Sequence, residues 1–178
     1  MKKLALAVVV FAIFAMVASS AMARKVRTTQ DMVGSKQNVV KTCEGKGVKM
    51  IGITYNDTQN ADCMDAVSVI CKGKKGEFEV PNSDFNDRSK IRIKCNPYEK
   101  VVGVVYKDRA GKDQADGASV ICRDRKHGEE RIAYNKDLQG GRQYVETKIM
   151  SPKDQVIGIV YNDRVNGDCV DGVGIVEK

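Results

Sequence analysis

The sequence predicts an all-β protein, and three observations support this class. A segment of the form apolar-apolar-Gly-apolar-x-Tyr occurs three times, each time followed by a polar stretch and a second apolar segment. These segments are rich in Val and Ile and alternate at period two, which is typical of strands. No later part of the chain carries the sustained apolar stripe of an amphipathic helix. We therefore expect strands joined into hairpins.

Residues 1–23 have the features of a cleavable signal peptide. Lys2 and Lys3 precede an apolar segment, Leu4–Ala18, and Ala21-Met22-Ala23 supplies small residues for cleavage. The apolar segment is shorter than the roughly 20 residues that span a bilayer, and no later segment is apolar enough to do so. We expect a secreted or periplasmic chain that begins near Arg24 and has no membrane span after cleavage.

The remaining residues, 24–178, form one domain of three repeats. The segments that contain the repeated glycine and tyrosine align with one another: Val48–Asp57, Lys100–Asp108 and Gln155–Asp163. A second match lies upstream, at intervals of 53 residues: Asp31, Asp84 and Asp137. Repeats at such a period indicate one structural unit used several times. The units cover about 25–72, 77–123 and 130–178.

Each unit reads as four strands. The hairpins are Met50–Tyr55 with Ala66–Lys72, Val101–Tyr106 with Ala118–Arg123, and Val156–Tyr161 with Val173–Glu177. The weaker strands that precede them are Val26–Thr29, Asn38–Thr42, Glu77–Val80, Lys90–Lys94, Arg131–Tyr134 and Tyr144–Lys148. One unit cannot bury both faces of its sheet, so three must share a core. Three four-stranded Greek-key sheets about a pseudo-threefold axis make a β-prism; a β-trefoil, which also repeats four strands three times, is the alternative.

All six cysteines lie in the exported part, and an even number in an oxidising compartment favours disulfides. Units one and two each carry one cysteine before the hairpin and one at its end, whereas unit three has Met150 and Glu177 there. The two remaining cysteines occupy the same loop position in units one and three. The predicted bonds are Cys43–Cys71, Cys95–Cys122 and Cys63–Cys169. Since His127 is the sole histidine and no Cys-x-x-Cys pair occurs, no metal site is predicted.

The third hairpin, Val156–Ile175, resembles the last hairpin of jacalin-related lectins, which carry a Gly-x-x-x-Asp motif. The threefold repeat as a whole is similar to the vitelline membrane outer layer protein 1 family. Both resemblances imply a β-prism, and the first implies that Gly167-Asp-Cys-Val-Asp171 holds a hexose through backbone amides and a carboxylate. Unit one has Ala61 in place of the glycine, and the lectins' N-terminal glycine has no match at Arg24.

Aspartates gather in the three hairpin loops, where carboxylates near backbone amides bind sugar hydroxyls or Ca²⁺. The candidate ligand residues are Gly167, Asp168, Asp171, Asp163, Asp62 and Asp65. Alternatively, such aspartates fix turns by bonding to the backbone, and recurrence favours this role for Asp65, Asp116 and Asp171. No cofactor is predicted, because the spacing does not match an EF-hand loop; Ca²⁺ remains an alternative.

Two further residue types recur in every unit. Tyr55, Tyr106 and Tyr161 end their strands, and we expect their rings to pack beneath the loops rather than to stack on a sugar. The mid-strand glycines Gly52, Gly103 and Gly158 indicate a close backbone approach, which we expect at the prism core.

The charge and aromatic content limit the classes of function that the chain can have. Without Lys2 and Lys3 the chain has 28 basic and 23 acidic side chains, a net charge of +5. These cations are scattered with few aromatic neighbours, which argues against nucleic-acid binding and allows a mild attraction to anionic polymers. We expect a non-catalytic protein that binds glycans or cell-envelope polysaccharide. The alternatives are a protein-binding module, such as an inhibitor of a periplasmic or foreign hydrolase, and a glycan-cleaving or glycan-transferring enzyme.

Overall fold

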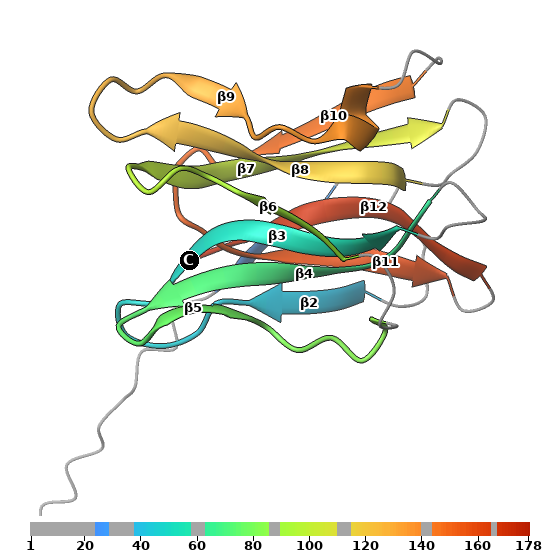
Figure 1. Ribbon diagram of the computed structural model, residues 1–178, viewed down its shortest axis with the longest axis horizontal. Coiled ribbons are helices and arrows are strands. Elements are labelled where there is room, and N and C mark those ends of the chain that lie inside the picture. Colours follow the sequence, from blue (N-terminus) through green and yellow to red (C-terminus); the bar gives the residue numbers. More distant parts are fainter. Residues whose placement is uncertain are drawn as a thin grey trace, which may run out of the picture.

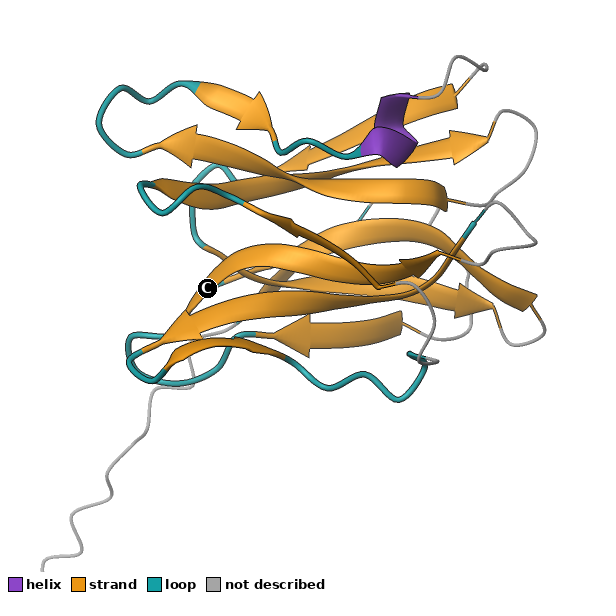
Figure 2. Cartoon of the chain, viewed as in Figure 1, coloured by secondary structure: helices purple, strands orange, loops and turns teal. Residues whose placement is uncertain are grey.

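The computed structural model describes residues 24–28, 38–57, 63–85, 90–109, 115–139, 144–164 and 167–178. Strands dominate the described chain, and the helical segment η2 is a single turn (Figure 2). The elements are β1 (Lys25–Arg27), β2 (Asn38–Thr42), β3 (Lys49–Asp57), β4 (Met64–Gly73), β5 (Gly76–Glu79), β6 (Lys90–Lys94), β7 (Glu99–Arg109), β8 (Ala115–Asp124), β9 (Glu130–Ile132), η2 (Lys136–Gln139), β10 (Tyr144–Met150), β11 (Val156–Arg164) and β12 (Gly167–Glu177). The expected signal peptide, residues 1–23, lies outside these ranges. Within them, no helix has the length and apolar character needed to cross a bilayer.

The twelve strands form three antiparallel four-stranded sheets (Figure 1). Sheet I has the order β5-β4-β3-β6, sheet II β10-β7-β8-β9, and sheet III β1-β12-β11-β2. In sheets I and II three successive strands pair and the fourth returns beside the first, which is the Greek-key order. Sheet III has the same spatial order, with β1 and β2 in the places of the third and fourth strands after β11 and β12. The fold is therefore the predicted β-prism, and the β-trefoil alternative is wrong because the strands close three separate sheets.

The sheets are out of phase with the repeats drawn from the sequence. Each of the first two hairpins pairs with the two strands that follow it, not with the two that precede it. In sheet I a tight turn is the cause: Gly73 and Gly76 pair across a two-residue loop and fold β5 back onto β4. In sheet II the turn after Asp124 folds β9 back onto β8, where Arg123 pairs with Glu130. Strands β1 and β2 consequently pair with the last hairpin, so segments from the two ends of the chain complete sheet III.

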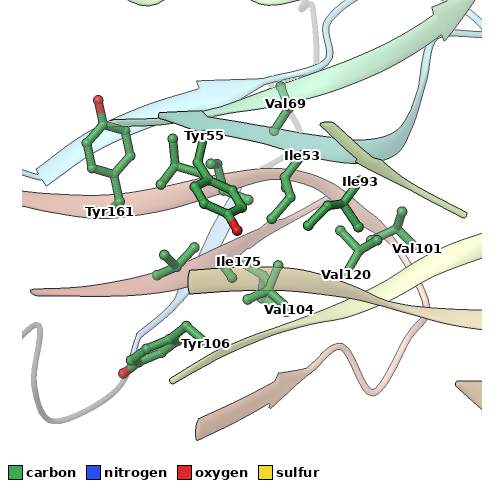
Figure 3. Packing of buried hydrophobic residues seen from close by; sticks show 14 of the residues in the cluster. Ile53, Tyr55, Val69, Ile93, Val101, Val104, Tyr106, Val120, Tyr161 and Ile175 are labelled. Atoms are coloured by element: carbon green, nitrogen blue, oxygen red, sulfur yellow. The ribbon is translucent and has the colours of Figure 1, made fainter. Parts of the chain in front are cut away.

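The inner faces of the three sheets enclose one core, part of which Figure 3 shows. Its aliphatic members come from every sheet, with Ile53 and Val69 from sheet I, Val104 from sheet II and Ile175 from sheet III. Tyr55, Tyr106 and Tyr161 belong to the same cluster, and each is fully buried. Alternate residues of each strand point inward, as the period-two pattern predicts.

The mid-strand glycines mark three equivalent β-bulges, because the register between hairpin strands shifts just before each of them. A Cβ at Gly52, Gly103 or Gly158 would lie 2.1, 2.4 or 2.3 Å from the carbonyl oxygen of Ile93, Ile149 or Lys41, respectively. Those oxygens belong to the neighbouring edge strand of the same sheet. The close approach is thus real, but it lies within each sheet and not at the prism core.

Three disulfides join different sheets, and they are the pairs that the repeat predicts: Cys43–Cys71, Cys95–Cys122 and Cys63–Cys169. Cys43 and Cys95 directly follow β2 and β6, and their amides donate to the bulge carbonyls of Ile157 and Ile51. The amide of Ser151 makes the same bond to Val102 after β10. Ser151 is therefore the third equivalent position, and the alignment with Met150 was wrong by one residue.

Candidate functional site

Strands β3, β7 and β11 end, and strands β4, β8 and β12 begin, at one end of the prism, at the right of Figure 1. This end is called the hairpin end below. The Cys63–Cys169 bond lies at this end, with 5.7 Å between the two Cα atoms, and ties the start of β4 to β12. Asp65 and Asp171 each follow one of these cysteines by two residues, or about 7 Å of strand. Both are partly buried. The disulfide thus brings two of the predicted ligand residues into one region.

The Gly-x-x-x-Asp segment is strand, not loop. Gly167 begins β12 and pairs with Arg164 across a two-residue connection, and Asp163 pairs with Val170. The sequence placed the end of the first strand at Tyr161 and the start of the second at Val173, but the strands continue to Arg164 and from Gly167. Part of this backbone is therefore engaged in the sheet. Only the backbone positions of Asp163 and Asp168 are described, whereas Asp62 lies outside the described residues.

A β-bulge places Asn162 beside Asp171. Tyr161 pairs with Val173 and Asp163 pairs with Val170, so Asn162 faces the two residues 171 and 172. On its other side Asn162 pairs with Asn38 of β2. Direct partners in an antiparallel sheet share a face, and the flanking Tyr161 and Val170 point into the core. Asn38, Asn162 and Asp171 therefore form a polar row on the outer face of sheet III, called the polar row below.

Asn162 is the unusual member of the polar row. Its side chain is fully buried, yet neither Oδ1 nor Nδ2 has a hydrogen-bond partner among the described residues. A buried amide of this kind costs stability and calls for an explanation, such as a bound water or ligand. Asn162 and Asn38 lie outside the motifs that the sequence shows; the one available signal was Asn56, which occupies the place of Asn162 in unit one and is also buried.

The recurring tyrosines are structural. Tyr161 donates to Asp84 Oδ2 (3.0 Å) and accepts from Asn82 Nδ2 (2.8 Å), which also reaches the carbonyl of Val67. Tyr55 repeats the arrangement with Asp137 (2.6 Å) and Asn135 (2.7 Å). Each hydroxyl thereby ties its own sheet to the next. Because the rings are fully buried, they cannot serve as surfaces for sugar stacking.

The cysteine–carboxylate cluster at the opposite end of the prism is not a metal site. Cys95, Glu99 and Cys122 offer ligand atoms within 4.8 Å of one another, but the two sulfurs are bonded to each other. Arg131 donates two hydrogen bonds of 2.7 Å to Glu99. These bonds lower the pKa of Glu99, against the effect of its burial. The carboxylate is therefore already neutralised.

Comparison with known proteins gives likeness of fold only. No protein-family model matches the sequence, and no curated protein matches it. A mannose-binding jacalin-related lectin from Ananas comosus is 11% identical over 86% of this chain and 95% of its own, with a TM-score of 0.47.

Two other solved structures give similar values. A mannose-specific jacalin-related lectin from Morus nigra is 18% identical over 85% of this chain and 99% of its own, with a TM-score of 0.45. A prostate-specific WGA16 glycoprotein lectin is 9% identical over 86% and 96%, with a TM-score of 0.47. Strand order and pairing, independently of these likenesses, define this chain as a β-prism of three four-stranded sheets.

Proposed function

We propose that this chain is an exported, non-catalytic glycan-binding protein whose site is the polar row at the hairpin end of sheet III. The observation that carries the proposal is the buried Asn162 amide, which has an unused donor and an unused acceptor among the described residues. A sugar hydroxyl both donates and accepts, so it complements such an amide. Because Asn162 has no exposed surface, binding there requires its side chain, or the part of the chain that covers it, to move aside. The neighbouring Asp171 adds a charged acceptor, whose hydrogen bonds to hydroxyls are stronger than those of a neutral one.

The surroundings of the row support this role. The Cys63–Cys169 bond fixes β12 against sheet I at this end, which limits the ordering cost of binding. Gly167 lacks a side chain and allows a ligand to approach the start of β12. Three disulfides, together with the signal peptide expected at residues 1–23, support export into an oxidising compartment. The lectins with similar folds are named for mannose binding, which makes mannosides the first ligands to test.

The test is a glycan array with the oxidised chain, followed by titration of the best ligand. Asp171→Asn should weaken binding about tenfold or more, because it removes a charge-assisted acceptor. Asp116→Asn is the matched control, since Asp116 holds the same repeat position in sheet II, where unit two has one residue too many for the Gly-x-x-x-Asp spacing. If Asp171 only fastens a turn, both changes will lower the melting temperature and neither will alter the affinity.

Gly167→Ala is a second test of the site. Unit one has Ala61 at the same repeat position, so the fold should accept an alanine there. We expect little change in stability and a loss of affinity. An array without any bound glycan would contradict the proposal and favour the protein-binding alternative.

A further inference from the structure

The end of the prism opposite the long hairpins contains a cavity of about 630 Å³. Its wall is built from the starts of β3, β5 and β7, the ends of β4 and β6, and the turn after β8. The cationic side chains that line it are Lys49, Lys72, Lys74, Lys94 and Arg125. All five are exposed to solvent, so a ligand can reach them.

Most of this positive charge is not compensated. Glu77 and Glu99 are the acidic residues in the lining. Glu77 forms an ion pair with Lys94 (2.8 Å). Glu99 forms its ion pair with Arg131, a residue outside the cavity lining, and so does not neutralise a lining cation. Among the described residues, Lys49, Lys72, Lys74 and Arg125 form no side-chain ion pair. The cavity therefore presents a cluster of unpaired cations to solvent.

Two of these cations oppose each other directly. Lys49 and Lys72 are Cα partners in the β3–β4 ladder, and like charges at such positions destabilise a sheet. An anion placed between the two ammonium groups would remove this repulsion. The arrangement is thus electrostatically complementary to a negatively charged ligand.

The cationic surface continues beyond the first cavity. A second hollow of about 340 Å³ shares Lys49 and Arg125 with it. Tyr98 lies beside this path, 60% exposed, and its carbonyl accepts a hydrogen bond from the Arg125 amide. An exposed tyrosine offers a flat apolar ring with a polar edge, which suits contact with a sugar ring next to a charged group.

Two covalent links hold this end of the molecule in place. Cys95 and Cys122 connect sheets I and II next to the cavity, and Cys95 itself lines it. Cys43–Cys71 connects sheets I and III one residue from Lys72. A wall fixed in this way loses little conformational freedom when a ligand binds.

We propose that this surface is a second site, and that it binds an anionic polysaccharide carrying carboxylate or sulfate groups along the path from Lys74 past Lys49 to Arg125. Strand β3 runs from Lys49 to Asp57, so the two ends of the prism are about 26 Å apart. The site is therefore separate from the polar row, and one short oligosaccharide cannot fill both. The proposal does not depend on the function proposed for the polar row.

The test titrates the oxidised chain with polygalacturonate, dextran sulfate and neutral dextran at low and physiological salt. We expect both charged polymers to bind, with an affinity that falls as salt rises, and neutral dextran not to bind. The double variant Lys49→Gln/Lys72→Gln should lose about tenfold in affinity, as expected for two solvent-exposed charge contacts. Lys136→Gln/Lys148→Gln removes the same charge away from the cavity and is the matched control.

Equal losses in the two double variants would overturn the proposal, because net charge alone would then explain binding. Absence of binding at low salt would also overturn it. A DNA duplex that competes as well as the polysaccharides would reassign the site to nucleic acid. Melting curves of both variants show whether each is folded, and the Lys49 and Lys72 changes are not expected to destabilise the chain.

Discussion

Ser151 donates a 2.6 Å hydrogen bond to Glu177 at the position where the other two sheet junctions of this type carry a disulfide. Both residues are buried, and Arg27 adds a 2.7 Å ion pair to the same carboxylate. Of the three equivalent junctions between sheets, two are therefore covalent and the third is held by polar contacts.

This equivalence predicts that a fourth disulfide can be built. Ser151→Cys/Glu177→Cys should form a bond, since the Cα atoms of both equivalent pairs lie 5.6 Å apart. Closing a loop of this length contributes up to about 3.5 kcal/mol by loop entropy, reduced by the loss of the Arg27 ion pair. The checks are a thiol count and melting curves with and without reductant. Two free thiols in the folded double variant would show that the junctions are not equivalent.

The Glu177 carboxylate makes part of the stability depend on pH. Burial alone would raise the pKa of Glu177, but the hydrogen bonds from Ser151 and Arg27 outweigh it and lower the pKa. When the pKa in the folded state lies below the unfolded value of about 4.3, the ionised carboxylate stabilises the fold above that pH. This stabilisation is lost as the pH falls through the folded-state pKa. Glu99, whose pKa is lowered by Arg131, acts in the same direction.

Melting temperature should therefore fall steeply on acidification below about pH 4. Glu177→Gln is expected to lower the melting temperature at pH 7 and to flatten this acid limb. Glu146→Gln, at an exposed ion pair with Lys148, is the control and should change neither. An unchanged acid limb in Glu177→Gln would disprove the role given to this carboxylate.

The tyrosine hydroxyls predict a second kind of stability effect. Tyr55→Phe leaves the buried Asn135 amide with one partner fewer and removes the bond to Asp137, at a cost of about 1–3 kcal/mol. Tyr161→Phe should behave alike through Asn82 and Asp84. Tyr134→Phe is the control, because that ring is 72% exposed. Urea unfolding measures all three, and equal midpoints would show that the hydroxyl bonds contribute nothing.

The sequence predicted the parts of this fold that local patterns determine. Alternating apolar residues indicate the hairpins, and repeated positions of Cys43, Cys71, Cys95 and Cys122 indicate their pairing. The phase of the sheets was missed because it depends on the turns that fold β5 back onto β4 and β9 back onto β8. The returning strands have only 4 and 3 residues, too few for a clear alternating pattern. Ser151 was missed because the spacing before the third hairpin differs from that of the first two.

The candidate site was only partly predictable for a similar reason. Asp171 and Gly167 are visible in a sequence motif. The polar row, however, arises from a bulge that sets Asn162 against Asp171 and from the pairing of β2 with β11. The first contact depends on a shift of register that no residue pattern indicates, and the second joins Asn38 and Asn162, which are more than 100 positions apart in the sequence.

The most direct test of the central claim is a glycan titration and a melting curve for Asn162→Ala. If the Asn162 amide forms its hydrogen bonds only with a bound sugar, the substitution removes an unsatisfied buried group from the free protein. The melting temperature of the free protein should then stay the same or rise. Affinity for the glycan selected on the array should fall at least about tenfold. A lower melting temperature with unchanged affinity would contradict the account and make Asn162 a structural residue.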